Sequence, residues 1–165
     1  MRHGSVFKMV VATAALENNT ITTKTTVNDT GIYPRGHNPA CWIYTSRHYG
    51  HGYLNVTEAI KKSCNYFFYE LGYKMGIDPV IKYAKSYGLG IKTGIELSGE
   101  SKGIVDLKDY CKETTGQEWQ FGDTLSAVIG QSYNSYTPIQ IARYTSMLAN
   151  GGKSVDCLLY TSDAA

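Results

Sequence analysis

The chain has 165 residues, 42% of them hydrophobic and 18% charged, and its sixteen basic and fourteen acidic side chains give a formal charge of +2. This length suits one domain with a single core, and the composition is not that of a disordered chain. The charge is too small to indicate a nucleic-acid groove, no stretch approaches the roughly 20 apolar residues of a membrane helix, and four cysteines are too few for a disulfide framework.

The first part of the chain is predicted to form one helix and then a long irregular region. Apolar side chains recur with helical spacing over residues 5–18, and the predicted buried face holds Phe7, Val10, Val11, Ala14 and Ala15. Residues 19–54 lack this period and are rich in Thr, Gly, Pro and Asn. We expect loops and short strands there, including one in the β-branched run 21–27.

A capping box begins the next predicted helix. Asn55 has the spacing to cap the helix, and Glu58 has the spacing to return to the Asn55 amide. This helix is expected to run to about residue 63. After a break, a second helix is predicted over 66–75, and its aromatic residues at 66–69 are expected to lie in the core.

The second half of the chain is predicted to contain two further helices. Asp78, read as a cap before a first-turn proline, opens a helix that ends at Gly88. Residues 89–130 are Gly-rich and are expected to be irregular. Thr137 begins a Thr-Pro-Ile-Gln cap, and the helix that follows is predicted to end near Asn150, before two glycines.

Ser5 and Lys8 form a Ser-x-x-Lys motif on the first predicted helix. Residues three apart lie on one helix face, so their side chains can meet. A serine hydroxyl is a weak nucleophile until a neighbour takes its proton, and a lysine can do so when burial or nearby charge holds it neutral. Taken alone, the motif more often marks a solvated serine and lysine.

Ser63 and Asn65 form a Ser-x-Asn motif in the predicted break between two helices. A hydroxyl and an amide two residues apart on a turn can face one cleft, where the serine relays a proton and the asparagine holds a substrate amide. Alone, this pattern is more often a helix-ending cap. The order and spacing of the two motifs together are those of penicillin-binding proteins and β-lactamases.

Residues 4–153 resemble the transpeptidase domain of class B penicillin-binding proteins, within the penicillin-binding protein 2-like group. The resemblance is carried by GSVFKMVVATAALE, GHGYLNVTEAIKKSCNYFFYELG, YGLGIKTGIELSGE and IGQSYNSYTPIQIARYTSMLANGG. It implies an α+β fold, the penicillin-binding protein and serine β-lactamase-like transpeptidase fold, with helices on both sides of a five-stranded antiparallel sheet. Residues 1–153 are expected to hold mainly its helical part, with much of the central sheet missing.

Residues 154–165 are expected to be a tail foreign to this domain. Cys157–Ala165 match no preceding pattern and resemble the peptide produced when a transposon-end sequencing adapter is translated in frame. A genuine strand is the alternative. We therefore expect the chain to be an internal piece of a longer protein.

Lys92, Thr93 and Gly94 spell the third motif of this family but precede the last predicted helix. In the family, the catalytic Lys-Thr/Ser-Gly lies on a strand after that helix. We therefore predict a conformational loop at 92–94 and expect the third motif to follow residue 153. Because that strand also supplies an oxyanion amide, we expect the chain by itself to have no useful turnover.

The resemblance implies a peptidoglycan D,D-transpeptidase that forms a serine acyl-enzyme. Ser5 attacks the D-alanyl-D-alanine carbonyl of a stem peptide, Lys8 accepts the proton, Ser63 or Lys8 returns one to the leaving D-alanine, and Asn65 holds the substrate. β-Lactams enter the same path and stall. The resemblance implies no catalytic cofactor. It implies a location at the extracytoplasmic face of the cell membrane and, as a partner, a membrane glycosyltransferase of the cell-elongation machinery.

Four alternatives have related motifs: two enzymes of β-lactam hydrolysis, a carboxypeptidase, and a sensor, which is a binding module. A D,D-carboxypeptidase differs only in using water as the acceptor, and a β-lactam sensor is acylated without turnover; these residues exclude neither. A class A β-lactamase needs a Glu-x-x-Leu-Asn sequence, which the chain lacks, and a class D enzyme has Ser-x-Val where this chain has Ser63 and Asn65 around Cys64.

Asp29, Cys41, His51 and Cys64 are metal-type side chains within one loop-rich region. Two thiolates, an imidazole and a carboxylate suit tetrahedral zinc, although the spacing alone leaves ordinary buried Cys and His side chains as an alternative. Some penicillin-binding protein 2 members carry a structural zinc, and the resemblance implies Asp29, His51 and Cys64 as ligands. Cys41 stands where those members have a second Asp. His48 is the alternate ligand, and His37 is expected in solvent.

Overall fold

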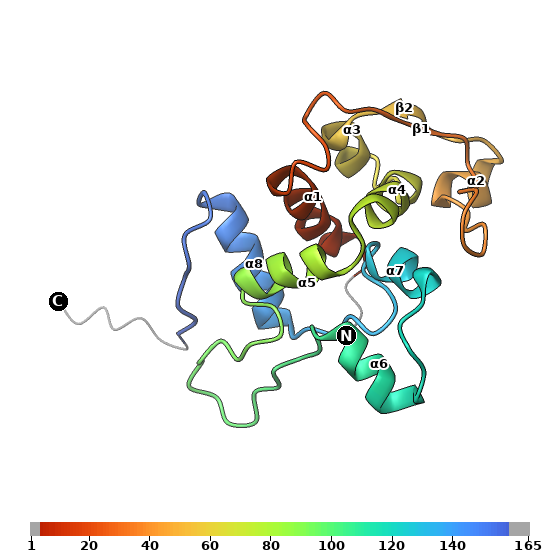
Figure 1. Ribbon diagram of the computed structural model, residues 1–165. Coiled ribbons are helices and arrows are strands. Elements are labelled where there is room, and N and C mark those ends of the chain that lie inside the picture. The colour runs from red at the N-terminus through yellow and green to blue at the C-terminus, as the bar shows by residue number, and fades with distance from the viewer. Residues whose placement is uncertain (1–3, 159–165) are drawn as a thin grey trace.

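Helix α1 (Lys8–Glu17) lies at the centre of the computed structural model, which describes residues 4–158 (Figure 1). It packs against α3 (Val56–Lys61), α4 (Asn65–Met75) and α5 (Asp78–Ser86), and its alanines let these helices approach closely. The predicted apolar face is buried, which confirms it. Burial extends to Lys8 and Ala12 on the rest of the helix, because neighbours surround it on several sides.

A two-stranded antiparallel sheet lies at one end of the described residues, beside α2 (Trp42–Arg47) and α3 (Figure 1). Strand β1 (Val27–Asp29) pairs with β2 (Gly52–Leu54), with Val27 opposite Leu54 and Asp29 opposite Gly52. The predicted strand over 21–27 is wrong except at its last residue. Thr22 and Thr25 bond to each other through side chain and backbone, and such local bonds compete with strand pairing.

Three helices lie where the sequence pattern predicted none. The predicted loop region 19–54 contains α2, and the predicted irregular region 89–130 contains α6 (Leu107–Thr115) and α7 (Phe121–Ala127). Each has a narrow buried side; in α6 it is Leu107 and Cys111, one turn apart. Short helices with so few apolar residues are stabilised by packing rather than by a visible period.

The capping predictions hold at two helices and fail at a third. The Asn55–Glu58 capping box before α3 is present, as is the one at Thr137 before α8 (Pro138–Ala149). Asp78 is not a cap: it is the first residue of α5, and its carboxylate pairs with Lys108 at 2.6 Å. The Asp78 carboxylate, which the local sequence predicted to cap the helix, therefore pairs with Lys108 from α6.

The small sheet and α2 lie at one end of the described residues and α6 lies at the other end, with α1 between them (Figure 1). Helix α7 packs on α4, and the aromatic residues predicted at 66–69 are buried, with Tyr66 and Tyr69 packed against Tyr33. None of the described helices combines the length and apolar composition needed to cross a bilayer. Of the predicted tail, residues 159–165 lie outside the described residues.

Candidate active site

Ser5 lies on a tight turn directly before α1. Residues Gly4–Phe7 form a 3-10 turn, η1, rather than the start of the α-helix that the periodicity predicted. The Ser5 side chain is exposed, whereas Lys8, the first residue of α1, is only 2% exposed. The Lys8 Nζ lies 3.2 Å from the Ser5 Oγ. The three-residue spacing thus places a buried amine beside an accessible hydroxyl.

The loop between α3 and α4 brings the second motif onto this pair. Ser63 has φ +50°, a left-handed conformation that is uncommon for a serine, and its Oγ donates a 2.7 Å hydrogen bond to the Ser5 Oγ. The Lys8 Nζ donates to the Ser63 Oγ at 2.9 Å and to the Asn65 Oδ1 at 2.6 Å. The structure therefore brings together all four predicted catalytic residues.

Lys8 has the electrostatic setting of a base. Burial lowers its pKa from 10.5 to about 8, although the nearby Cys41 and Cys64 thiols act in the opposite direction. In the neutral amine, two N–H groups can donate to the Ser63 backbone oxygen (2.8 Å) and to the Asn65 Oδ1, and the lone pair remains for the Ser5 proton. The same contacts thus hold the amine in place and aim it at Ser5.

A second loop supports the nucleophile turn from outside. The Gly4 amide donates to the Gly130 carbonyl at 3.2 Å, and Gly130 has φ +78°. A Cβ at Gly130 would overlap the Gly4 carbonyl oxygen, so only glycine permits this approach. The Tyr144 hydroxyl from α8 donates to the Val6 carbonyl at 3.1 Å. These contacts fix the backbone that carries Ser5.

An open groove of about 420 Å³ gives access to the serines. Besides the catalytic residues it is lined by three side chains that the sequence did not single out, Trp42, Ile129 and Gln131. The Trp42 indole N–H donates to the Lys62 carbonyl at 3.1 Å, which holds the ring across the loop that carries Ser63. Two features of the sequence pointed to these side chains: Trp42 lies next to Cys41, and Gln131 lies within a stretch that resembles the family.

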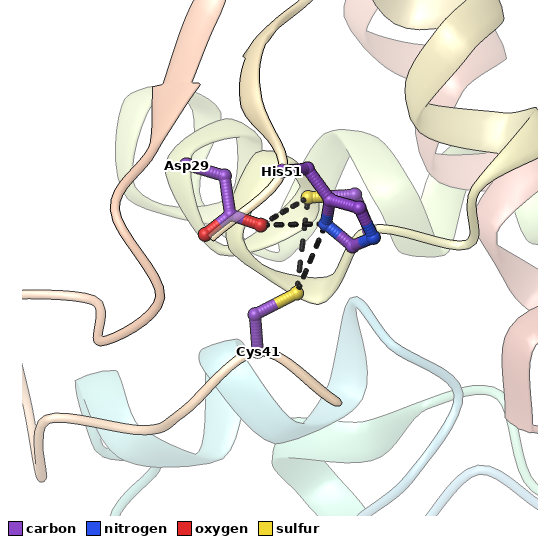
Figure 2. Close-up of side chains that lie close together, drawn as sticks. Asp29, Cys41 and His51 are labelled. Carbon is purple, nitrogen blue, oxygen red and sulfur yellow. Dashed lines mark hydrogen bonds and ion pairs between the residues drawn. The ribbon is translucent and has the colours of Figure 1, made fainter. Parts of the chain in front are cut away.

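Behind the catalytic loop, four metal-type side chains converge. The donor atoms of Asp29, Cys41, His51 and Cys64 all lie within 4.8 Å of one another. Strand pairing opposite Gly52 sets Asp29 beside His51, and the His51 Nδ1 lies 2.7 Å from the Asp29 Oδ2 and 3.7 Å from the Cys41 Sγ (Figure 2). The two sulfurs are 3.9 Å apart, and the Cys64 Sγ lies 3.2 Å from the Asp29 Oδ2.

The charges of this cluster are set by its own hydrogen bonds. Burial alone would raise the pKa of Asp29, but bonds from His51, Cys64 and the Gly31 amide hold it below its usual range. The Cys64 thiol hydrogen-bonds Cys41 and lowers the pKa of Cys41 to about 6. The same contact, together with burial, raises the pKa of Cys64. The pair therefore shares one negative charge near neutral pH.

The remaining candidates lie elsewhere. His48 ends α2 and packs its ring on Tyr44 at 5.9 Å, so it is not part of the cluster and the alternate-ligand prediction is wrong. His37 is exposed, as predicted. Thr93 donates its amide and hydroxyl to Glu100 at 2.6 and 2.8 Å, in a loop that does not line the groove.

An accessible serine bonded to a buried lysine of lowered pKa and to a second serine is the arrangement found in serine acyl-transfer proteins. Comparison with known families agrees with this class. The family model described as the penicillin binding protein transpeptidase domain matches residues 1–164, and the chain belongs to that family. The resemblance inferred from the motifs is thereby confirmed.

Individual relatives extend this result. The chain is 35% identical over 152 residues to the Haemophilus influenzae protein named peptidoglycan D,D-transpeptidase MrdA, covering 90% of this chain and 23% of that relative. The structure matches penicillin-binding protein 2 of Helicobacter pylori in its complex with MreC, at 34% identity and a TM-score of 0.88, over 98% of this chain and 30% of that one. It also matches Pseudomonas aeruginosa PBP2 in complex with WCK 5153, at 33% identity and a TM-score of 0.86, over 95% and 36%. These matches confirm the predicted fold class.

Proposed function

We propose that this chain carries the nucleophile and second motif of a peptidoglycan D,D-transpeptidase, acting on D-alanyl-D-alanine stem peptides. The observation that supports it most is the bond network that joins Ser5, Lys8, Ser63 and Asn65 at the floor of an open groove. The chain spans about a quarter of the length of the curated relatives it matches, so activity is proposed for these residues within a protein of that length.

In the acylation step, the neutral Lys8 amine takes the Ser5 proton as the Ser5 Oγ attacks the terminal D-alanyl-D-alanine carbonyl. The collapse of the tetrahedral adduct needs a proton on the leaving D-alanine nitrogen. Ser63 lies 2.7 Å from Ser5 and 2.9 Å from Lys8, so it can pass the Lys8 proton to that nitrogen. An acyl-enzyme ester on Ser5 remains.

The second step reverses these roles with a different nucleophile. The amine of a neighbouring stem peptide attacks the ester, and Lys8 takes its proton directly or through Ser63. The Asn65 side chain holds Lys8 by its Oδ1 at 2.6 Å and also bonds to Tyr69, so a second amide N–H is available to the bound peptide. As the adduct collapses, Lys8 returns the proton of the attacking amine to the departing Ser5 oxygen, which restores the Ser5 hydroxyl and forms the cross-link.

A chimaera tests the function. Residues 4–153 replace the matching segment of the Haemophilus influenzae relative, and the purified protein is given a D-alanyl-D-alanine donor with an acceptor amine. We expect D-alanine release together with a cross-linked product, both lost on Ser5→Ala. D-alanine release without any cross-link would show a carboxypeptidase instead, and stoichiometric acylation without release would show a sensor.

We propose that Asp29, Cys41, His51 and Cys64 bind a structural zinc ion. Tetrahedral zinc with thiolate and imidazole ligands sets sulfur–sulfur edges of about 3.8 Å and sulfur–nitrogen edges of about 3.6 Å. The observed separations of 3.9 Å and 3.7 Å fit these edges. The Asp29 Oδ2 lies closer to His51 and Cys64 than the edges of a zinc tetrahedron would place it. Such short distances are expected of hydrogen bonds between ligands that still carry their protons.

The role of this site would be to hold the second motif. Cys64 stands between Ser63 and Asn65, so a ligand bond at Cys64 restrains both catalytic side chains. We expect about one zinc per chain by elemental analysis. His51→Ala should lose it, and the matched control His48→Ala should keep it. Equal zinc content in the two variants would contradict the proposal.

We further propose an extracytoplasmic, membrane-associated setting and a partner in the cell-elongation machinery, including a membrane glycosyltransferase. The support is the likeness to the Helicobacter pylori protein, whose structure is a complex with MreC. Co-purification of the chimaera with the host MreC, compared with the unmodified relative, tests this assignment. Loss of MreC binding in a chimaera that still acylates would contradict it for this segment.

A further inference from the structure

Cys41 and Cys64 form a thiol pair from two separate segments of the chain. Their sulfurs lie 3.9 Å apart, and neither side chain is exposed to solvent. Cys41 precedes α2 and Cys64 precedes α4. A disulfide needs the sulfurs at about 2.05 Å, so the pair must close by about 2 Å.

The two cysteines lie in segments of different kind. The Cys64 sulfur accepts the Phe67 amide at 3.4 Å and donates to Asp29 at 3.2 Å, at the start of an 11-residue helix. The Cys41 sulfur contacts His51 at 3.7 Å and Cys64 at 3.9 Å and also bonds to the Tyr66 backbone amide and to Asp29, but the residues at 34–38 before it are exposed. Closure can therefore come from the Cys41 side, through movement of a surface segment, while α4 stays in place.

We propose that Cys41 and Cys64 are an oxidation site, at which a disulfide forms in the metal-free chain and excludes metal binding. The oxidant is a low-molecular-weight disulfide. One cysteine thiolate attacks it and releases one thiol; the second thiolate then attacks the mixed disulfide and releases the other. The cysteines lose two electrons and two protons, and the oxidant's sulfur–sulfur bond is reduced to two thiols.

Exclusion follows from the chemistry of sulfur as a ligand. Zinc binds thiolates, and a disulfide sulfur offers none, so oxidation removes two of the four donors at once. The disulfide would also join the catalytic loop at Ser63 and Asn65 to the segment that carries Trp42, a wall of the groove. The thiol pair alone carries the oxidation site, which does not depend on the transpeptidase proposal, whereas the exclusion of metal rests on the zinc proposal.

The experiment uses the 165-residue chain with Cys111→Ala and Cys157→Ser, so that only the pair remains. Chelator-treated and zinc-supplemented samples are exposed to glutathione disulfide, natively and in urea. Free thiols are counted by alkylation, and the linked peptides are identified by mass spectrometry. The matched control is Cys41→Asp, which keeps an ionisable ligand and removes one thiol; near-ultraviolet circular dichroism checks each fold.

We expect the native metal-free chain to form the Cys41–Cys64 disulfide at least about tenfold faster than the urea-denatured chain, because folding holds the thiols together. Zinc should slow formation of this disulfide about tenfold or more, and the Cys41→Asp variant should form no disulfide. Persistent glutathione adducts on both cysteines, no reaction, or equal native and denatured rates would overturn the oxidation site. Unchanged oxidation in zinc-loaded protein would overturn the exclusion. A chain that binds no zinc but forms the disulfide would refute the zinc proposal and the exclusion with it, and would support the oxidation site.

Discussion

Replacing Lys8 by Met should remove the catalytic base and change how the free energy of unfolding depends on pH. The side chain is 2% exposed, and its pKa falls from 10.5 to about 8 on burial. That difference corresponds to about 3 kcal/mol of cost for holding the amine charged in the folded chain near neutral pH. Methionine fills similar volume without charge.

The gain is smaller than this cost because Met cannot bond to Ser63 and Asn65. Lys8 donates three hydrogen bonds to these residues, and at about 1 kcal/mol each their loss costs about 3 kcal/mol, so we expect Lys8→Met to leave the free energy of unfolding close to the wild-type value at pH 7. The balance changes with pH. Between about 8 and 10.5 the folded amine releases its proton while the unfolded one keeps it, so the wild-type chain gains stability as pH rises.

Urea unfolding of the metal-free chain at pH 7 and at pH 10 measures both values. Lys8→Met should be about 2 kcal/mol less stable than wild type at pH 10, whereas the exposed control Lys24→Met should stay within about 0.5 kcal/mol of wild type at both pH values. A variant more than about 2 kcal/mol away from wild type at pH 7 would contradict the balance of burial and hydrogen bonding. A difference independent of pH would show that the lowered pKa is not its cause.

Three further predictions follow from the same geometry. Ser132 has φ +63°, so Ser132→Gly should raise the free energy of unfolding by about 0.5–1 kcal/mol in urea titrations, and a loss would contradict it. Gly130→Ala should cost about 2–4 kcal/mol by the same method because its Cβ overlaps Gly4; an unchanged midpoint would argue against this packing. Acylation of the chimaera by a fluorescent penicillin should rise about tenfold between pH 7 and 9 as Lys8 becomes neutral, and a flat profile would exclude this base.

The sequence predicted those features of the fold that depend on residues close together in the chain, such as helix caps. The capping boxes at Asn55 and Thr137 involve side chains three residues from their partners, so they form wherever the helix does. Asp78 carries a different local signal, an acid before a first-turn proline, and its carboxylate meets Lys108 from α6 rather than the amides of its own helix. Helix α6 has two buried apolar contacts, and its state depends on neighbours that no short window of sequence contains.

The candidate site divides in the same way. The Ser5–Lys8 contact follows from helical spacing, whereas the approach of Ser63, fifty-eight residues away, was expected only from the resemblance. Trp42 enters the groove because its indole bonds to the Lys62 carbonyl, a contact without a sequence signature. The pairing of Asp29 with His51 likewise depends on the register of β1 and β2. The sequence pattern over 19–54 predicted loops and short strands but no register between them.

The most direct test of the central claim identifies the atom that becomes acylated. The chimaera carrying residues 4–153 is labelled with a fluorescent penicillin, digested and analysed by tandem mass spectrometry, alongside Ser5→Ala. The account predicts one acyl group, on the hydroxyl of Ser5, and no label in the variant. An acyl group on another residue, or undiminished labelling of Ser5→Ala, would contradict it.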